Sequence, residues 1–360
     1  MKKVQNHDNI ILIYLNSRFG GSDIMNFCTK DMQITKGENF RLYGRPFYVD
    51  GIPALSWSNS GIEFCADFER FTVYFGDYVS EMPVYVKIYV DGKEFKHAVS
   101  GKNNAAVLEG FKNTPHTVKI LRISEGDVLL TVRFIRIFGS HAEFLPLPKE
   151  NKRLKLEFLG DSITCGYGVT ASCKQNEFFT CEEDSTLTYA FLTAKALDAE
   201  IRTVSISGQG IVHSCGDSVG IRMEEILKLR ARGHSDVYTP EEDWQPDFFI
   251  LNAGANDKYE HTDSETFRKY ALKLLSDIRA LYPKAHIIWL YGMYKNFSKE
   301  IDEISKSFAL SDGNYSYMFA GSVWENKQKF CGAVGHPNTL VSEKVSKQLI
   351  KLINNKLSQK

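Results

Sequence analysis

The chain has 360 residues, which exceeds what one ordinary hydrophobic core accommodates and suffices for two domains. Hydrophobic residues make up 43% of the chain and charged residues 24%, a balance that excludes an intrinsically disordered protein. Lysine plus arginine equals aspartate plus glutamate, 44 each, so the chain lacks the global positive field that favours nucleic acid or anionic membrane as a partner.

The N-terminal segment resembles a signal peptide only in part. Lys2 and Lys3 precede a short apolar run at residues 10–15, but Arg18 follows soon after it and no small-residue cleavage site is apparent. We expect residues 1–35 to form an ordered N-terminal extension, and the protein to be cytoplasmic unless a signal segment has been removed. No stretch approaches the roughly 20 apolar residues of a membrane span.

Residues 36–148 have the texture of strands and turns. β-branched and aromatic residues, often alternating with polar ones, are concentrated at residues 71–75, 84–90, 117–123 and 129–137. Asp91-Gly92 separates two such runs and indicates a tight hairpin. Because no convincing helical pattern interrupts this region, it predicts an all-β sandwich, in the form of a jelly roll.

Residues 149–360 alternate between strand and helix patterns, after a stiff Leu-Pro-Leu-Pro connector at 145–148. Strands are expected at residues 154–159, 204–206, 248–251, 287–291 and 315–319, and helices at 187–197, 221–231, 266–281, 300–308 and 341–353. This alternation predicts an α/β domain with three layers, in which helices cover both faces of a parallel sheet. Ligands of such sheets bind at the carboxyl ends of the strands.

The cysteines show no metal-binding pattern. Their number is odd, their spacing is irregular and no CxxC pair exists; they are Cys28, Cys65, Cys165, Cys173, Cys181, Cys215 and Cys331. We therefore expect no zinc site and no other cofactor. In a reducing compartment most would be small buried apolar residues, whereas Cys173 and Cys181 share one loop and could pair in an oxidising compartment.

Four short blocks stand at the expected strand ends or just before the last helix. They are Gly160-Asp161-Ser162, Ser205 to Gly210, Gly254 to Asp257, and Gly335 to Asn338. A serine hydroxyl is a weak nucleophile until a base takes its proton, and His336 can serve as that base. The oxyanion of the intermediate needs preorganised donors, which the N–H of Ser162, the N–H of Gly208 and the amide of Asn256 could supply.

Each block alone has an ordinary structural explanation. The Gly-Asp-Ser tripeptide and Gly208 are typical of turns, Asn256-Asp257 is typical of a helix cap, and His336 precedes a proline in a loop. The ordered set of all four, each at a predicted strand end or loop, favours a serine hydrolase. We interpret Asp161 and Asp257 as hydrogen-bonded organisers of these loops and not as catalytic acids.

The blocks GDSITCGYG, SISGQG, GAND and GHPN resemble those of the SGNH (GDSL-type) hydrolases. This resemblance implies Ser162 as nucleophile and His336 as base, with Gly208 and Asn256 as further oxyanion donors. Through WSNSGIEF at residues 57–64 and similar stretches at 156–168 and 181–189, the chain is also similar to carbohydrate esterase family 2. The similarity covers most of residues 40–355. Membership of that family implies a jelly roll before the SGNH domain, and removal of O-acetyl groups from acetylated xylan or mannan saccharides.

One position departs from the common SGNH pattern. Many of these enzymes have an aspartate three residues before the histidine, where this chain has Ala333. We therefore expect a Ser162–His336 dyad, in which a backbone carbonyl orients the imidazole, as in some relatives. A more distant acid, Asp312 or Glu325, is the alternative.

The saccharide-binding residues are less well defined by the sequence. Trp324 lies between the last strand and His336 and could stack on a sugar ring or plug the interior, and Tyr259 is a weaker candidate. Trp289 is expected in the core. Two other functions fit the chain: an SGNH esterase of lipid, thioester or other small acyl substrates, and a carbohydrate-binding protein with a vestigial hydrolase domain.

Overall fold

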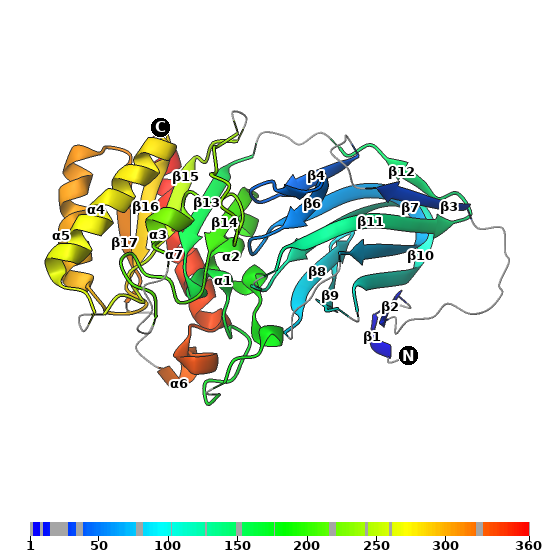
Figure 1. The fold of residues 1–360 in the computed structure, drawn as a ribbon, viewed down its shortest axis with the longest axis horizontal. Helices are drawn as coiled ribbons and strands as arrows, with labels where there is room; N and C mark the ends of the chain where they lie inside the picture. Colours follow the sequence, from blue (N-terminus) through cyan, green and yellow to red (C-terminus); the bar gives the residue numbers. More distant parts are fainter. Residues whose placement is uncertain are drawn as a thin grey trace. The chain divides into compact units, whose positions relative to one another are not determined.

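The computed structural model describes residues 3–7, 10–14, 28–33, 39–76, 82–101, 103–126, 128–148, 153–175, 177–215, 221–241, 244–258, 261–321 and 327–359. The chain divides into two compact units. The first comprises Met1–Glu150 together with Ala231–Gly233, and the second comprises Asn151–Arg230 and His234–Lys360. In Figure 1 the first unit runs from blue to cyan-green, and the second continues from green to red.

The first unit is an antiparallel sheet. Its strands are β1 (Lys3–His7), β2 (Ile10–Tyr14), β3 (Cys28–Gln33), β4 (Phe40–Tyr43), β5 (Tyr48–Val49), β6 (Ile52–Leu55), β7 (Gly61–Phe75), β8 (Val84–Val90), β9 (Lys93–Val99), β10 (Ala105–Arg122), β11 (Leu130–Gly139) and β12 (Glu143–Leu145). The long strand β7 lies between β10 and β11 and curls with them, as Figure 1 shows. The predicted all-β class of this region is confirmed.

Alternation along these strands builds the core of the first unit. Successive side chains of a strand point to opposite faces, so every second residue of β7 faces inward. Phe64 and Phe68 are fully buried in this way, and Phe71 is fully buried after the β7–β10 pairing shifts register between Phe68 and Arg70. Phe71 forms edge-to-face pairs with both Phe64 and Phe68. The β8–β9 hairpin turns at Asp91-Gly92 as predicted, because both residues adopt the left-handed conformation, with φ of 51° and 83°.

The second unit is a parallel sheet with helices. Its strands are β13 (Lys155–Gly160), β14 (Glu200–Ser205), β15 (Phe248–Asn252), β16 (His286–Tyr291) and β17 (Tyr315–Phe319), in the order β14-β13-β15-β16-β17. Its helices are α1 (Ser162–Cys165), α2 (Tyr189–Ala196), α3 (Met223–Ile226), α4 (Ser264–Leu281), α5 (Ser298–Ser311), α6 (Lys327–Phe330) and α7 (Thr339–Leu357). The predicted three-layer α/β architecture is confirmed (Figure 1).

Helices cover both faces of this sheet. Phe248 of β15 belongs to a buried cluster with residues of α2 and α7, such as Tyr189 and Leu349. The next residue, Phe249, points to the opposite face and contacts Tyr282, directly after α4, with ring centroids 5.5 Å apart. Both faces of the sheet are thereby shielded from solvent. Its carboxyl-terminal edge carries the loops described below.

Helix α3 and strand β14 depart most from their predicted bounds. Helix α3 has four residues and not the expected 221–231, because the chain turns at Leu229 into a bridge with Val237. Strand β14 spans Glu200–Ser205, whereas the sequence predicted a strand at residues 204–206 only. Among the described residues, no helix combines the length and the apolarity needed to cross a membrane.

Candidate active site

Ser162 lies at the sharp turn after strand β13, which is flanked by β14 and β15 in the sheet. Asp161 caps helix α1, because its Oδ1 accepts a hydrogen bond from the N–H of Ile163 at 3.0 Å. A Cβ at Gly160 would lie 2.1 Å from Thr164 Oγ1, so only glycine allows this close approach of strand and helix. The side chain of Ser162 is 5% exposed and starts the helix at the carboxyl edge of the sheet.

His336 comes to Ser162 from the loop before α7, 174 residues further along the chain. Its Nε2 lies 2.9 Å from Ser162 Oγ, within hydrogen-bond distance. The chain turns tightly before it, since His336 N donates to Ala333 O at 3.0 Å and Gly332 N donates to His336 O at 2.7 Å. The structure thus pairs the predicted nucleophile and the predicted base.

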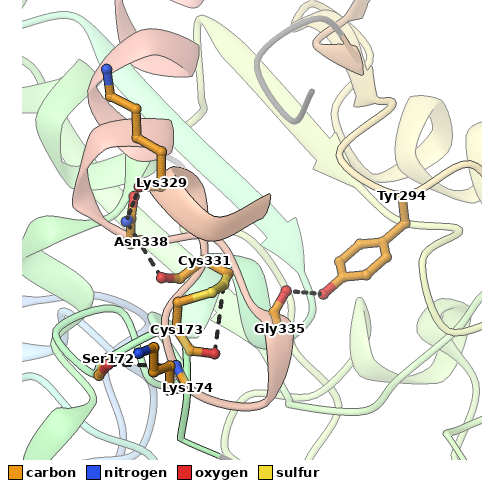
Figure 2. Close-up of a disulfide and its surroundings, with 8 residues drawn as sticks. All are labelled: Ser172, Cys173, Lys174, Tyr294, Lys329, Cys331, Gly335 and Asn338. Carbon is orange, nitrogen blue, oxygen red and sulfur yellow. Dashed lines mark hydrogen bonds between the residues drawn. A yellow bond between two sulfur atoms is a disulfide. The ribbon is translucent and has the colours of Figure 1, made fainter. Parts of the chain in front are cut away.

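A disulfide fastens this loop to the segment that follows the nucleophile (Figure 2). Cys173 and Cys331 are joined, with their Cα atoms 4.8 Å apart. The suggested Cys173–Cys181 pairing is therefore wrong, because Cys173 is joined to Cys331, and Cys181 is an exposed thiol in the short helical turn Thr180–Glu182.

The remaining cysteines outside the disulfide divide between the interior and the surface. Cys65 and Cys165 are buried, as the sequence predicted for most of the cysteines. Cys28 and Cys215 are exposed, as Cys181 is, so the expectation of mostly buried cysteines is wrong for these three.

Tyr294 supports the same loop through a hydrogen bond. Its hydroxyl donates to the carbonyl of Gly335 at 3.1 Å, a contact drawn in Figure 2. Burial raises the pKa of Tyr294 well above its ordinary value, so the phenol stays protonated and acts as a donor. The residue directly before His336 is thus fixed from a second direction.

The two further predicted oxyanion donors reach the site from β14 and β15. Gly208 follows β14 with φ of 80°, and in the described part of the chain neither its N–H nor that of Ser162 donates to a backbone acceptor. Asn256 Nδ2 donates to Gln209 O at 2.9 Å and to Asp161 Oδ2 at 3.3 Å. Asn256 therefore links the nucleophile turn to the Gly208 loop.

Asp257 organises the Gly208 loop. Its carboxylate is fully buried and accepts hydrogen bonds from the backbone N–H groups of Ile211, Val212 and His213 at 2.8 to 3.1 Å. Burial raises the pKa of Asp257, while these three donors lower it in part. A Cβ at Gly210 would lie 2.7 Å from Asp257 Oδ2, so the tight approach requires glycine. This is the organising role that the sequence indicated.

Ala333, which stands where many SGNH enzymes have the catalytic aspartate, is tightly packed. Ala333 is fully buried, and a Cβ at Gly168 would lie 2.6 Å from the Ala333 side chain. Asp312, one alternative acid, follows α5 and precedes β17, at the amino-terminal edge of the sheet, and its Oδ2 accepts from Arg279 Nε at 2.8 Å. Glu325, the other alternative, lies outside the described residues.

Aromatic residues were only partly foreseen. Trp324 and Tyr259, the predicted sugar contacts, lie outside the described residues, and Trp289 is fully buried in the core as expected. Tyr167 packs its ring on the imidazole of His336, with centroids 4.4 Å apart. Sequence analysis missed this contact, although Tyr167 stands in the Gly166-Tyr167-Gly168 turn that directly follows the nucleophile helix.

Comparison with known proteins gives matches of both sequence and structure. Residues 158–314 match the GDSL-like Lipase/Acylhydrolase family. The chain is 27% identical over 251 residues to the cellulase/esterase CelE of Acetivibrio thermocellus, covering 67% of this chain and 29% of that protein. It is 29% identical over 204 residues to an acetylxylan esterase / glucomannan deacetylase of Cellvibrio japonicus, covering 53% of each. The chain thus spans less than two thirds of the length of either relative.

Solved structures share the fold over most of the chain. A family two carbohydrate esterase from Clostridium thermocellum, in complex with cellohexaose, has a TM-score of 0.80 and 23% identity, covering 89% of this chain and 99% of that one. One from Cellvibrio japonicus has a TM-score of 0.78 and 20% identity, covering 91% and 98%. Residues 158–314 are thus similar to the GDSL-like Lipase/Acylhydrolase family, and the chain shares the fold of the solved family two carbohydrate esterases, a jelly roll followed by an SGNH domain.

Proposed function

We propose that the protein is a serine esterase that removes O-acetyl groups from saccharides derived from plant polysaccharides, such as acetylated xylan or mannan oligosaccharides. The observation that carries this proposal is the 2.9 Å contact between Ser162 Oγ and His336 Nε2 at the carboxyl edge of the parallel sheet. Nucleophile and base within hydrogen-bond reach are the signature of an activated hydroxyl.

Acylation follows from this geometry. His336 Nε2 takes the proton of Ser162 as Oγ attacks the acetyl carbonyl carbon, and a tetrahedral intermediate forms. The intermediate collapses as His336 returns the proton to the departing sugar oxygen, leaving acetyl-Ser162. Water then attacks this ester by the same proton transfers and releases acetate.

The oxyanion of each intermediate needs donors that already point at it. The N–H groups of Ser162 and Gly208 supply two, since no backbone acceptor in the described part of the chain occupies them. Asn256 Nδ2 supplies the third by giving up its 3.3 Å hydrogen bond to Asp161, the longer of its two. One such donor is worth about 2.7–4 kcal/mol of barrier.

The saccharide substrate is supported by the relatives. One is an acetylxylan esterase / glucomannan deacetylase, and one similar structure holds cellohexaose. An acetyl group also fits a site in which Ser162 is 5% exposed, since a long acyl chain needs a broad apolar groove. Saccharide-bound acetate is therefore the substrate class that we assign.

Acetate release from acetylated xylan and mannan oligosaccharides tests this function. Wild-type protein should release acetate from at least one of them and hydrolyse 4-nitrophenyl acetate, whereas Ser162→Ala should abolish both activities without changing the circular dichroism spectrum. The matched control is Ser311→Ala, which removes a hydroxyl at the end of α5 that donates to Phe308 O at 3.0 Å. Turnover by Ser162→Ala within tenfold of wild type would exclude Ser162 as the nucleophile.

A panel of acyl chain lengths tests the substrate class separately. The acetyl ester should be hydrolysed faster than the butyryl and octanoyl esters of 4-nitrophenol. A preference for octanoate, with no acetate released from any oligosaccharide, would contradict the saccharide assignment and would leave the serine mechanism intact.

A further inference from the structure

Tyr167 lies between two other rings beside the base. Its ring centroid is 4.4 Å from that of His336, at an interplanar angle of 37°, and 3.7 Å from that of Phe178, at 14°. One face of a phenol ring has no room for two rings at such separations. Phe178 and His336 therefore pack on opposite faces of Tyr167.

Hydrogen bonds connect the backbone around Tyr167 both to the turn of Ser162 and to the loop that carries His336. The N–H of Tyr167 donates to the carbonyl of Ser162 at 3.1 Å, and the carbonyl of Gly168 accepts from the N–H of Ala333 at 3.2 Å. Gly166 and Gly168 both have positive φ, 90° and 59°, which lets the turn follow these two contacts. The position of Tyr167 is thus fixed relative to both Ser162 and His336.

The face of an aromatic ring attracts a cation within about 6 Å of its centroid, because the ring quadrupole is negative there. In the proposed mechanism, His336 acts as a base and therefore starts as the neutral imidazole; it becomes a cation when Nε2 takes the Ser162 proton. An attraction of this kind is stronger in the transition state than in the ground state, so it accelerates the chemical step and leaves substrate binding unchanged.

We propose that Tyr167 is a positioning residue that orients the imidazole of His336 and stabilises its cationic form through the face of its ring. The role rests on the proposed serine mechanism. The proton passes from Ser162 Oγ to His336 Nε2 and on to the departing sugar oxygen, and Tyr167 neither gains nor loses one. The contribution replaces part of what a carboxylate at the position of Ala333 would provide.

Substitutions that change the ring in steps test this role. Tyr167→Phe should keep kcat within about twofold of wild type, because the ring face remains. Tyr167→Leu should lower kcat about 5- to 30-fold, the range that corresponds to a cation–π contact of about 1–2 kcal/mol. The KM for 4-nitrophenyl acetate should stay unchanged in both variants.

Fluorinated phenylalanines at position 167 separate electrostatics from packing. Phenylalanine with one, two and three ring fluorines keeps its shape while the negative face weakens, so log kcat should fall step by step with each fluorine. Phe178→Leu is the matched control, because it removes the ring on the far face and leaves the Tyr167–His336 contact; its kcat should fall less than that of Tyr167→Leu.

Three results would overturn the role. They are equal kcat values across the fluorinated series, a wild-type kcat in Tyr167→Leu, and a large loss in Tyr167→Phe, which would assign the effect to the hydroxyl. Thermal unfolding of each variant excludes a folding defect as the cause. A wild-type protein without Ser162-dependent hydrolysis would overturn the proposed function together with this role, whereas an active wild type with insensitive variants would overturn this role alone.

Discussion

Two loops complete the site around Ser162. The loop of residues 208–215 is held by hydrogen bonds to the buried carboxylate of Asp257, whereas the loop of residues 331–338 is held by a disulfide and by hydrogen bonds with Tyr294 and Gly168. An unpaired buried N–H costs about 1–3 kcal/mol, so the first loop keeps its shape only while its acceptor is in place. A disulfide acts mainly by restricting the unfolded chain. The comparison predicts that damage to the first loop lowers activity, and that damage to the anchors of the second lowers stability.

The largest expected effect removes the one reactive group that the second loop carries. His336→Ala should lower kcat/KM by about 10⁴-fold or more, because no other group then accepts the Ser162 proton. The measurement is hydrolysis of an acetylated oligosaccharide, with unfolding followed in parallel. Leu340→Ala, an exposed side chain four residues away, is the control. A loss below tenfold in His336→Ala would remove His336 as the base.

The next effect tests the hydrogen-bonded loop. Asp257→Asn should lower kcat by about 10²-fold, because an amide oxygen replaces only part of the carboxylate and the loop that carries the Gly208 donor shifts. Asp263→Asn, at the cap of α4, is the matched control and should keep wild-type activity. If Asp257→Asn retains full kcat, this carboxylate does not set the position of the oxyanion donor.

Removal of the disulfide tests the second loop, where we expect a loss of stability with little loss of activity. The disulfide spans a sequence separation of 158, so the variant with both Cys173→Ser and Cys331→Ser should lose about 2–4 kcal/mol in the free energy of unfolding. Its activity at 25 °C should change little, because the Tyr294–Gly335 and Gly168–Ala333 hydrogen bonds remain. Cys181→Ser, which changes an exposed thiol outside this disulfide, should leave stability unchanged. A variant with wild-type stability and lost activity would reverse the comparison.

The smallest expected effect concerns the alternative acid. Asp312→Asn should keep kcat/KM within about twofold of wild type and cost less than about 1 kcal/mol of stability, because its carboxylate serves an ion pair with Arg279 at the far edge of the sheet. A loss near 10⁴-fold with the fold intact would show instead that Asp312 completes a triad.

Most of the fold followed from local patterns. Strand β17, Tyr315–Phe319, and helix α4 agree with the predicted ranges to within two residues, because an aromatic-rich strand and an apolar helical face can both be recognised from residue type and spacing. Helix α3 was overestimated for the opposite reason. Its apolar residues continue past Ile226, but a bridge between Leu229 and Val237 takes over the backbone hydrogen bonds there.

The sequence by itself determined which reactive and hydrogen-bonding groups the site contains. They are a serine after a strand, a distant histidine, and the glycines and asparagine of the blocks between them. Each of these depends on residue type and on position relative to a strand, which a single chain records. Tertiary structure decided which groups meet. The Ser162–His336 contact spans 174 residues, the cross-link joins Cys173 to Cys331, and Tyr167 packs on the base. Such contacts leave no periodic trace, because they depend on how separate loops converge at one edge of the sheet.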